Sequence, residues 1–589
     1  MIAESLIQKR VINTESVLPL EGPRGAEILI EALCFEGVDT IFGYPGGAVL
    51  HIYDELWRAR ERITHYLVRH EQGAVHMAEG YARSTGKVGC VLVTSGPGAT
   101  NAVTGIANAY MDSTPIVVIT GQVPKHLIGT DAFQEVDTVG ITRPCVKHNY
   151  LVRDPRDLAA VVREAFHLAR SGRPGPVVID IPKDVTAARA NYSRLDHVSF
   201  PFSTPKKKPA PGEVARAVKT ILSAKRPVLY VGGGITNSGA DESLREFAET
   251  FQLPVAPTLM GLGGFESGHQ LSLGMLGMHG TYAANMSVAE SDLLIAIGVR
   301  FDDRVTGKLA TFAPQASIIH VDIDPANIGK NVAPTQSITA DAQEVLDSFL
   351  AYAKQVAPDE LRQSLTAREP WWKRIRGWQR GQPLRFAGSQ SHIKPQSVIR
   401  ELHQLTKGEA IITTDVGQHQ MWVAQFYPFT RTRQLITSGG LGTMGFGLPA
   451  AVGAQLACPD RLVVAVVGDG GFQMTNQELA TAVQYNLPVK IVVMNNGYLG
   501  MVRQWQEMFY DRTYSEVDIS VAPDFVKLAE AYGAAAFRAT KPEELHDVLA
   551  AGLAHDGVAV MDIVVSKEEN VFPIVPAGAN ANDMIVQAD

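Results

Sequence analysis

The chain has 589 residues, of which 46% are hydrophobic and 19% are charged, and its formal net charge is -8. This length exceeds what one hydrophobic core usually supports, so we expect several domains of an ordinary soluble protein. The negative net charge, without a basic domain, argues against a nucleic-acid partner. The four cysteines show no CxxC spacing, which argues against a zinc site or a disulfide scaffold. No apolar run is long enough to span a bilayer and no signal-peptide pattern is present, so we predict a cytoplasmic protein with no membrane partner.

A strand followed by a helix is predicted for residues 63–83, ITHYLVRHEQGAVHMAEGYAR. Glu71 stands at the end of this strand, at the edge where α/β sheets bind ligands. A glutamate near a helix N-terminus also has a purely structural explanation, and the same alternative applies to Glu79. These residues alone leave the choice open.

Two parts of the chain repeat the same order of elements. Residues 88–122 and residues 462–500 each give a buried strand, a glycine turn, a helix, a proline and a second buried strand. A helix rich in small residues precedes each of these segments. We therefore predict an α/β fold of three doubly wound parallel-sheet domains, in which the first and third domains are copies of one unit.

The middle of the chain lies between two composition breaks. Residues 199–212 are rich in proline and lysine and predict a surface linker with solvated lysines. Strands are predicted at 227–234, 292–298 and 317–324, each ending in glycine or aspartate. Such ends suit a bound nucleotide, although a structural turn explains them equally well. Residues 355–395 predict a helical connector whose tryptophans dock on a neighbouring domain.

The second copy of the repeat carries a polar pair that the first copy lacks. Asp469 lies in the glycine turn after the strand at 462–467, and Asn496 follows the strand at 489–494. A right-handed crossover brings both strand ends to one edge of the sheet. Carboxylate and amide oxygens suit Mg²⁺ shared with phosphate groups, and Gly468 and Gly470 leave room for a diphosphate beside a helix start, which we expect near residue 476.

The Gly-Asp-Gly to Asn-Asn pattern resembles the motif of thiamine-diphosphate-dependent enzymes. Other stretches resemble most closely the catalytic subunits of the acetolactate synthase (acetohydroxyacid synthase) family, in the family's order from about Gly25 to Pro576. These stretches include GYPGGAVL, RHEQGAVHMAEGYAR, SGPGATN, GVRFDDRVTGK, TDVGQHQMW, GGLGTMGFGLPAA and LGMVRQWQ. The resemblance implies a transferase that decarboxylates pyruvate and joins the product to a second 2-ketoacid, pyruvate or 2-ketobutyrate. This is the first common step of branched-chain amino-acid biosynthesis.

The resemblance also implies three cofactors: thiamine diphosphate, Mg²⁺ and FAD in a non-redox role. Glu71 would bind the aminopyrimidine ring, and Met444 would support the cofactor in its bent conformation. Asp469, Asn496 and the backbone carbonyl of Tyr498 would bind Mg²⁺. The diphosphate would be surrounded by Gly417, Gln418, His419, Gly468 and Gly470. The positions that match the FAD site are Arg173, Gly232, Gly233, Gly234, His279, Arg300, Asp302 and Asp322.

Four further residues match the family's substrate pocket. Arg304 would bind the acceptor carboxylate, and its alternative is a surface ion pair with a neighbouring aspartate. Trp505 would recognise the acceptor's alkyl group, and its alternative is a core tryptophan. Gln134 and Lys183 would line the pocket. In this family, the glutamate and the metal site that serve one cofactor come from different subunits, so the resemblance implies a homodimer, commonly joined by a small regulatory subunit.

We predict domains at residues 24–190 (pyrimidine-binding), 212–352 (FAD-binding) and 395–566 (diphosphate- and Mg²⁺-binding), with a tail at 567–589 that forms a lid or is disordered. A flavin-using oxidase of the pyruvate oxidase type is the main alternative, but FDDRVTG and RQWQ favour the synthase. A glyoxylate carboligase is disfavoured because Glu71 is present. A non-catalytic nucleotide-binding regulatory protein is disfavoured because each matched position keeps a competent residue.

Overall fold

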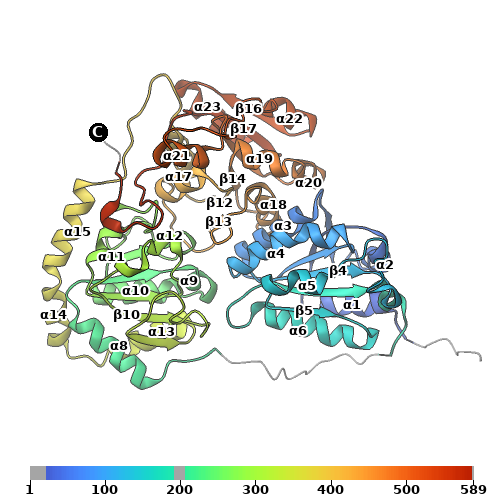
Figure 1. Cartoon of the computed structure of the whole chain (residues 1–589), viewed down its shortest axis with the longest axis horizontal. Coiled ribbons are helices and arrows are strands. Elements are labelled where there is room, and N and C mark those ends of the chain that lie inside the picture. Colours follow the sequence, from blue (N-terminus) through green and yellow to red (C-terminus); the bar gives the residue numbers. More distant parts are fainter. Residues whose placement is uncertain (1–21, 192–205, 587–589) are drawn as a thin grey trace, which may run out of the picture.

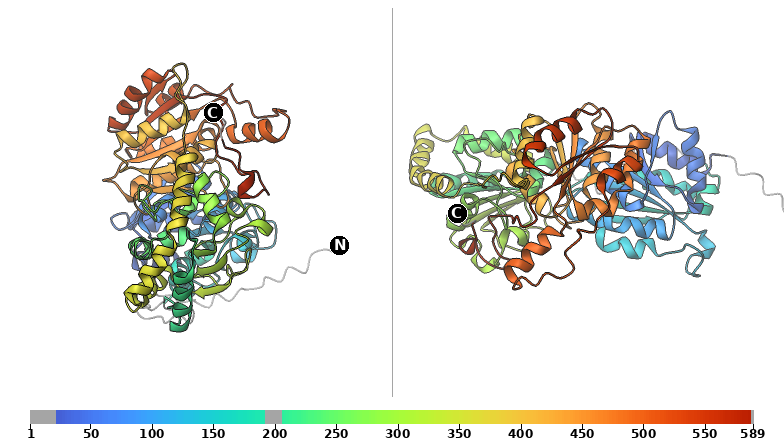
Figure 2. Two further views of the ribbon diagram at one scale, coloured as in Figure 1. Left: turned by 90° about the vertical axis from the view of Figure 1, so that its left-hand side faces the viewer. Right: turned by 90° about the horizontal axis from the view of Figure 1, so that it is seen from above.

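A computed structural model describes residues 22–191 and 206–586. Three parallel sheets, each covered by helices, make up the molecule (Figure 1). Seen from above in Figure 2, the C-terminal part lies between the N-terminal and middle parts. This arrangement confirms the predicted α/β class with three parallel-sheet units.

The first sheet has six parallel strands in the order β2-β1-β3-β4-β6-β5. Its strands are β1 (Thr40–Tyr44), β2 (Thr64–Leu67), β3 (Gly89–Val93), β4 (Ile116–Gln122), β5 (His148–Leu151) and β6 (Val177–Pro182). The helices that cover it include α1 (Gly25–Phe35), α2 (Leu50–Arg58), α3 (Glu71–Thr85), α4 (Pro97–Met111) and α6 (Leu158–Arg170).

The third sheet repeats this topology, with the order β13-β12-β14-β15-β17-β16. Its strands are β12 (Ile411–Thr414), β13 (Leu435–Thr437), β14 (Val463–Gly468), β15 (Lys490–Asn495), β16 (Ala535–Ala539) and β17 (Ala559–Val564). Numbered from the first strand of each sheet, both orders are the same, and every pairing is parallel. The predicted duplication is therefore confirmed.

The middle sheet has five parallel strands in the order β11-β10-β9-β7-β8. They are β7 (Pro227–Val231), β8 (Val255–Pro257), β9 (Leu293–Ile297), β10 (Ser317–Asp322) and β11 (Gln336–Thr339). Helices α8 (Pro211–Ser223), α9 (Gly233–Ser238), α10 (Asp241–Phe251), α11 (Tyr282–Glu290) and α13 (Ala342–Ala353) surround them.

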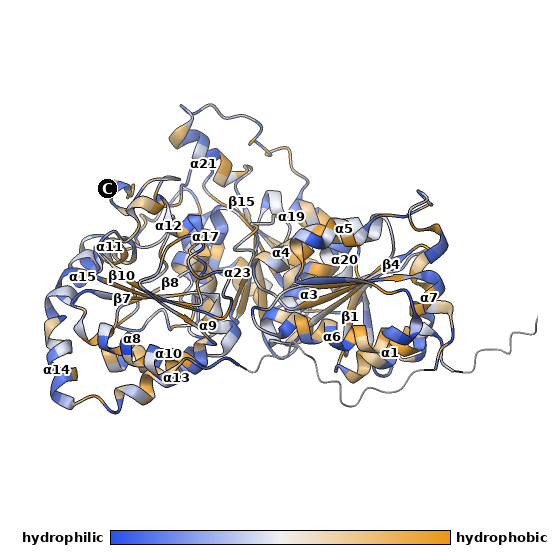
Figure 3. Cartoon of the chain, turned by 60° about the horizontal axis from the view of Figure 1, so that its bottom comes forward, coloured by the Kyte–Doolittle hydropathy of each residue, from blue (hydrophilic) through white to orange (hydrophobic). Residues whose placement is uncertain are grey.

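The central strands are buried on both faces, because helices cover both sides of each sheet. Every residue of β3, β4, β9 and β14 is buried, which explains their continuous apolar sequences. Figure 3 shows orange strands, among them β4, inside the units, and helices that carry both blue and orange residues around them. One hydrophobic cluster joins the first and third units, where α3 packs on α18 (Gly447–Ala457).

Two glycines allow the helices α3 and α18 to approach closely. A Cβ atom at Gly80 would lie 2.0 Å from the carbonyl oxygen of Ala450. A Cβ atom at Gly453 would lie 1.9 Å from the carbonyl oxygen of Met77. Both distances are far below van der Waals contact, so the small residues predicted in this helix set how the two units pack.

The predicted helical connector forms α14 (Pro358–Ala367) and α15 (Glu369–Gly381), and its tryptophans dock on the middle unit as predicted. Trp371 is buried and its indole N–H donates to the carbonyl of Pro227 at 3.2 Å. Trp372 donates to the carbonyl of Gln252 at 3.0 Å, and Trp378 packs edge-on against Trp371. These contacts combine apolar burial with a satisfied indole N–H.

The predicted linker extends beyond the described residues. Residues 199–205 lie outside them, and Pro211 already begins helix α8. Lys206 and Lys208 are largely exposed and form ion pairs with Asp341 and Glu344 at 3.4 and 3.6 Å. In the described part of the chain, no helix is both long and apolar enough to cross a membrane.

Candidate active site

The helix that carries Asp469 begins earlier than the sequence predicted. The structure forms α19 (Asp469–Thr475) directly after β14 and then α20 (Glu478–Gln484), whereas the pattern placed a turn at Asp469 and the helix start near residue 476. A Cβ atom at Gly471 would lie 2.3 Å from a carboxylate oxygen of Asp415. The glycines therefore let the first helical turn pack against that carboxylate, a contact that periodicity does not reveal.

Asp469 and the Asn495-Asn496 segment meet at the edge of the third sheet. The backbone N–H of Gly497 donates to Asp469 Oδ2 at 2.6 Å, and that of Gly470 donates to Oδ1 at 2.9 Å. Asn496 follows β15, and its Oδ1 accepts the N–H of Tyr498 at 3.0 Å. Each of these side-chain oxygens keeps a free lone pair, as a metal ligand requires.

Burial shifts the pKa of the Asp469 carboxyl. The residue is 2% exposed, and loss of hydration raises the pKa of its carboxyl to about 6, although backbone N–H donors oppose the shift. A bound cation would favour the ionised form and offset this cost. Among the described residues, no group of three or more His, Cys, Asp and Glu side chains forms a metal centre, so backbone and phosphate oxygens would have to complete the coordination.

The neighbouring residues fit a diphosphate. Gln418 and His419, at the start of α17 (Gln418–Phe426), are buried, and their Oε1 and Nε2 atoms have no hydrogen-bond partner within the described chain. Burial lowers the pKa of His419 to about 4, so its imidazole is neutral at pH 7. Gly417 has φ of +148°, and a Cβ atom at Gly468 would lie 2.9 Å from the His419 ring. Glycine thus keeps space beside two unpaired polar groups.

Met444 lies on the other side of the same glycine-rich segment. A Cβ atom at Gly470 would lie 3.5 Å from Met444 Cε and 2.8 Å from a methyl group of Leu499. The methionine therefore borders the start of α19, close to the atoms that surround Asp469. This position is compatible with the role that the resemblance implies.

Glu71 is the first residue of α3 rather than the last of a strand, because β2 ends at Leu67. Its carboxylate is 9% exposed and accepts a hydrogen bond from Asn101 Nδ2 at 3.0 Å. Gly98 leaves open space beside it, since a Cβ atom there would lie 3.3 Å from Glu71 Oε1. The nearby hydroxyl of Thr94 is buried without a hydrogen-bond partner in the described chain. These polar groups lie together in the unit that lacks the Asp-Asn pair.

A cavity of about 1550 Å³ lies where the three units meet. Segments of all three units line it, and so do ten of the predicted site residues: Arg173, Gly232, Gly233, Gly234, His279, Arg300, Asp302, Arg304, Asp322 and Trp505. Its size suits a dinucleotide together with a small substrate. We call it the central cavity.

The glycines after β7 have a packing role as well as a place on the cavity wall. A Cβ atom at Gly232 would lie 2.3 Å from the carbonyl oxygen of Gly298, and one at Gly234 would lie 2.5 Å from Gly298 Cα. Gly233 has more room, with Met260 Cβ at 3.3 Å from its hypothetical Cβ. Packing therefore explains Gly232 and Gly234, whereas the space beside Gly233 fits the other explanation, a bound nucleotide.

Charged and polar groups surround the rest of the central cavity. Asp322 ends β10, and burial raises the pKa of its carboxyl to about 6. Arg300 pairs with Asp302 at 2.5 Å, and Arg173 lies 3.7 Å from Asp324. His279 is buried, and its Nδ1 lies 3.2 Å from the carbonyl oxygen of Pro573. Carboxylates and cations at strand ends are the groups that bind ribose and pyrophosphate.

Arg304 and Trp505 lie at the exposed part of this cavity. Arg304 forms the surface ion pair that the sequence left as an alternative, with Asp303 at 3.3 Å, and 60% of its side chain is exposed. Trp505, in α21 (Gly500–Phe509), is half-buried and packs edge-on against Phe509 with 5.8 Å between ring centroids. It is not a core residue, so its indole is available to a ligand in the cavity.

The segment 567–586 packs against the middle unit beside Arg304. The N–H of Val575 donates to the carbonyl of Met278 at 2.8 Å, and that of Lys308 donates to the carbonyl of Ala579 at 3.1 Å. A small cavity of about 250 Å³ separates this segment from Arg304 and its neighbours. Residues 587–589 of the predicted tail lie outside the described chain.

Comparisons with known proteins agree with these features. Three family descriptions match: "Thiamine pyrophosphate enzyme, N-terminal TPP binding domain" at residues 23–141, its "central domain" at 214–349 and its "C-terminal TPP binding domain" at 415–563. The chain is 50% identical over 565 residues to the acetolactate synthase isozyme 3 large subunit of Escherichia coli K12, covering 95% of this chain and 98% of that protein. The chain belongs to the acetolactate synthase family of thiamine pyrophosphate enzymes.

Other members of the acetolactate synthase family are equally similar. The large subunit of Parasynechococcus marenigrum is 52% identical over 567 residues, covering 95% of this chain and 90% of that protein. The large subunit of Lactococcus lactis is 47% identical over 569 residues, covering 96% of this chain and 97% of that protein. The family that the motifs predicted is therefore confirmed, as is a thiamine-diphosphate-dependent enzyme.

Not all the predicted site residues of this chain line the central cavity. Glu71, Gln134 and Lys183 do not line the central cavity that Arg304 and Trp505 share. Gln134 adopts a left-handed backbone with φ of +59°, and Lys183 begins α7 (Lys183–Ala187). The side chain of Phe133, next to Gln134, is 88% exposed.

Several residues at the candidate site were missed from the sequence. Asp415 follows β12, is fully buried, and accepts the N–H groups of Gly445 and Gly447 at 2.9 and 3.0 Å. Because it stands at a strand end like Asp469, the same rule could have found it. Asn101, the partner of Glu71, lies within the SGPGATN motif, but no local pattern indicates which glutamate it contacts.

Proposed function

We propose that this chain is the catalytic large subunit of an acetolactate synthase. It would convert two pyruvates to 2-acetolactate, or pyruvate and 2-ketobutyrate to 2-aceto-2-hydroxybutyrate, with loss of CO₂, at the first common step of branched-chain amino-acid biosynthesis. The observation that carries this proposal is identity of about half of all residues, over nearly the whole chain, to large subunits of acetolactate synthases.

Asp469, Asn496 and the backbone carbonyl of Tyr498 would hold Mg²⁺, which would supply positive charge for the diphosphate of thiamine diphosphate. The buried carboxylate of Asp469 and the free lone pairs at the sheet edge support this assignment. Met444 would support the cofactor's ring region. The diphosphate would be bound by Gly417, Gln418, His419, Gly468 and Gly470, in agreement with the unpaired atoms of Gln418 and His419.

Thiamine diphosphate, when bound, supplies the nucleophilic carbon and the electron sink that decarboxylation of a 2-ketoacid requires. Glu71 would hold a hydrogen bond to its aminopyrimidine ring and so control the proton on that ring. Asn101 would orient the Glu71 carboxylate. The buried position of Glu71 keeps water from competing for this hydrogen bond.

Arg304 would bind the carboxylate of the acceptor ketoacid through its guanidinium group, which its exposure leaves free to reorient. Trp505 would contact the acceptor's alkyl group. Gln134 and Lys183 would complete the pocket from a partner subunit. Within one chain, neither residue lines the central cavity.

FAD would bind in the central cavity without taking part in net electron transfer. Its volume, about 1550 Å³, and the strand-end groups around it support this cofactor. The proposed ligands are Arg173, Gly232, Gly233, Gly234, His279, Arg300, Asp302 and Asp322.

A homodimer would bring Glu71 of one subunit to the metal site of the other. Phe133 and Leu50, on the N-terminal unit, are 88% and 54% exposed, and a partner subunit would cover apolar side chains of this kind. We also infer a separate small regulatory subunit, because the relatives are named large subunits. The proposed enzyme would work in the cytoplasm, with domains at 24–190, 212–352 and 395–566 and a tail at 567–589.

Product analysis tests the function. Purified protein receives pyruvate, thiamine diphosphate, Mg²⁺ and FAD, and oxygen uptake is followed in the same vessel. We expect acetolactate and CO₂ in equal amounts without oxygen consumption. Oxygen uptake with formation of acetate or acetyl phosphate would instead identify a pyruvate oxidase-type enzyme and overturn the roles of Arg304 and Trp505.

A further inference from the structure

Helices α3 and α4 are joined by two asparagine–glutamate contacts. Near the helix N-termini, Asn101 donates to Glu71 at 3.0 Å. Two turns further on, Asn108 Nδ2 donates to both carboxylate oxygens of Glu79, at 3.1 and 2.9 Å. The seven-residue spacing places both asparagines on one face of α4. Glu79 therefore contacts α4 and not a ligand, which decides the alternative left open by the sequence.

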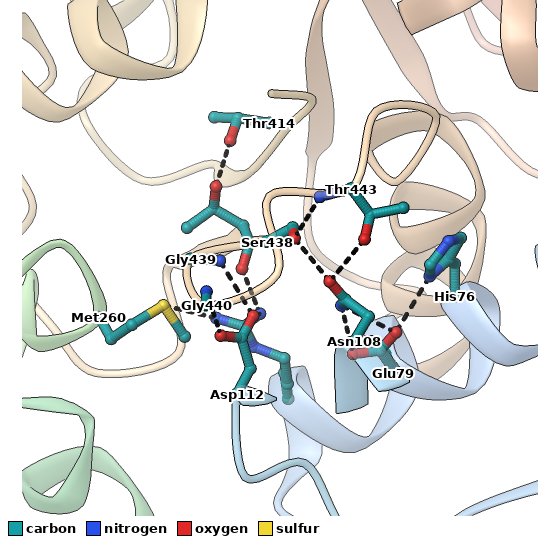
Figure 4. Close-up of polar contacts among 12 residues, drawn as sticks. His76, Glu79, Asn108, Asp112, Met260, Thr414, Ser438, Gly439, Gly440 and Thr443 are labelled. Atoms are coloured by element: carbon teal, nitrogen blue, oxygen red, sulfur yellow. Dashed lines mark hydrogen bonds and ion pairs between the residues drawn. The ribbon is translucent and has the colours of Figure 1, made fainter. Parts of the chain in front are cut away.

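Asn108 uses its remaining oxygen to hold a loop of the third unit. Its Oδ1 accepts hydrogen bonds from Ser438 Oγ at 2.6 Å and from Thr443 Oγ1 at 3.0 Å (Figure 4). Because Nδ2 faces the carboxylate of Glu79, the oxygen end of the amide faces the loop. The fully buried Asn108 side chain thus links Glu79 on α3 to two hydroxyl groups of the third unit. The segment concerned, residues 438–444, follows β13, and we call it the 438–444 loop.

The side chain of Asp112, the C-cap residue of α4, binds the backbone of the same loop. Its two carboxylate oxygens accept the N–H groups of Gly439 and Gly440, at 3.0 and 2.7 Å (Figure 4). The side chain is 1% exposed, and Arg83 lies 3.6 Å from it. Burial raises the pKa of this carboxyl, and Arg83 opposes the shift. Each of the two N–H groups thus has its own carboxylate oxygen, whereas an amide at this position would offer only one acceptor oxygen.

The 438–444 loop connects the two halves of the proposed site. Residues 438–442 line the central cavity, where FAD would bind. Met444, at the other end, borders Gly470 and the start of α19. A shift of even 1 Å at residues 439–440 would therefore move a cavity wall, and one at residues 443–444 would move the proposed support of thiamine diphosphate.

We propose that Asn108 and Asp112 are positioning residues: from the C-terminal end of α4 they fix the 438–444 loop, Asn108 setting Met444 and Asp112 setting the wall of the central cavity. Neither is assigned to hold a cofactor or substrate. Both ends of the Asn108 amide and both oxygens of Asp112 already have partners within the protein. The inference rests on the proposed function, because that function gives Met444 and the cavity their ligands.

Amide hydrogen exchange of the cofactor-free protein tests directly whether Asn108 and Asp112 hold the 438–444 loop. Asp112→Asn keeps the side chain's shape but turns one acceptor into an N–H donor that faces a backbone N–H. We expect exchange of the Gly439 and Gly440 amides to accelerate at least tenfold, with β14 and β15 unchanged. Asn108→Ala should likewise accelerate amide exchange at Ser438 and Thr443. Glu242→Gln, an exposed carboxylate-to-amide change on α10, is the matched control and should alter nothing.

Cofactor affinities separate positioning from general destabilisation. By fluorescence titration, we expect Asn108→Ala to weaken thiamine diphosphate with Mg²⁺ about tenfold, and Asp112→Asn to weaken FAD about tenfold, each leaving the other cofactor within about twofold. If Asn108→Ala does not fold, Thr443→Val removes one loop contact and should act in the same direction. Unchanged loop exchange, or an equal loss of both affinities in both variants, would overturn the proposal. A wild-type protein that binds neither cofactor would refute the proposed function instead. The exchange data would still show whether Asn108 and Asp112 hold the 438–444 loop.

Discussion

The backbone N–H of Gly497 donates to Oδ2 of Asp469 at 2.6 Å, although 28 positions separate the two residues. This bond fastens the loop after β15 to the first residue of α19. It fixes the carboxylate and the neighbouring Asn496 before any ligand arrives. Preorganisation of this kind lowers the entropic cost of assembling a metal site.

The raised pKa of Asp469 predicts how Mg²⁺ affinity depends on pH. Since the folded carboxyl has a pKa of about 6, it binds its proton more tightly than in the unfolded chain. The protonated carboxyl therefore contributes its full stability below the unfolded-state pKa of about 4. This contribution is lost as pH rises through the folded-state pKa of about 6. Mg²⁺ needs the ionised form, so we expect its apparent affinity to fall about tenfold per pH unit below 6.

Asp469→Asn separates this effect from titration of the cofactor's own phosphate. Thermal midpoints with and without Mg²⁺ and thiamine diphosphate, measured from pH 5 to 8, give the metal-dependent stabilisation of each variant. The asparagine variant should show weaker stabilisation and a smaller pH dependence than the wild type. Equal profiles for the two proteins would remove Asp469 from the metal site.

Glu71→Gln tests the proposed control of the cofactor proton. The amide keeps the size of the side chain and the contact with Asn101, but it cannot exchange a proton with the cofactor. We expect turnover to fall about 10²- to 10⁴-fold, with little change in the thermal midpoint. Glu61→Gln, at an 87% exposed side chain in the same unit, is the control and should behave as wild type. Normal turnover of Glu71→Gln would contradict the assignment.

Trp505→Leu tests acceptor recognition. The smaller side chain loses contact with an alkyl group in the cavity, and one methylene in a pocket contributes about 1–3 kcal/mol. We expect the preference for 2-ketobutyrate over pyruvate to decrease about tenfold, measured as the ratio of the two products from mixed substrates. Trp57→Leu, at a 70% exposed indole, provides the control. An unaltered product ratio would refute the role of Trp505.

Arg368→Met tests how the helical connector is held. The buried guanidinium of Arg368 donates to three backbone carbonyls of the middle unit, those of Ile221, Ala224 and Phe251. Its loss leaves buried acceptors unsatisfied, so we expect a destabilisation of about 3 kcal/mol. Arg362→Met removes an exposed ion pair with Asp359 and should cost less than about 1 kcal/mol. Urea unfolding of both variants measures the difference, and equal midpoints would contradict the prediction.

The candidate site was only partly accessible to sequence reasoning. Asp469 and Asn496 could be paired because each ends an apolar strand, and parallel topology brings such ends to one edge. The contact of Gly471 with Asp415 was not visible, so the start of α19 was placed about seven residues too late. The hydrogen bonds of Asn108 to Ser438 and Thr443 were also missed, because they join residues more than 300 positions apart.

The sequence by itself determined the parallel α/β units, their duplication and the family, because buried strands and strand-end motifs are local patterns in the chain. Only the tertiary structure decided which of those motifs meet. It gathered Arg173, Asp322 and Trp505 on one cavity and left Glu71 outside it. It also turned Glu79 toward Asn108 rather than toward a ligand. Packing between units decides such contacts, and packing depends on side chains that are far apart in the sequence.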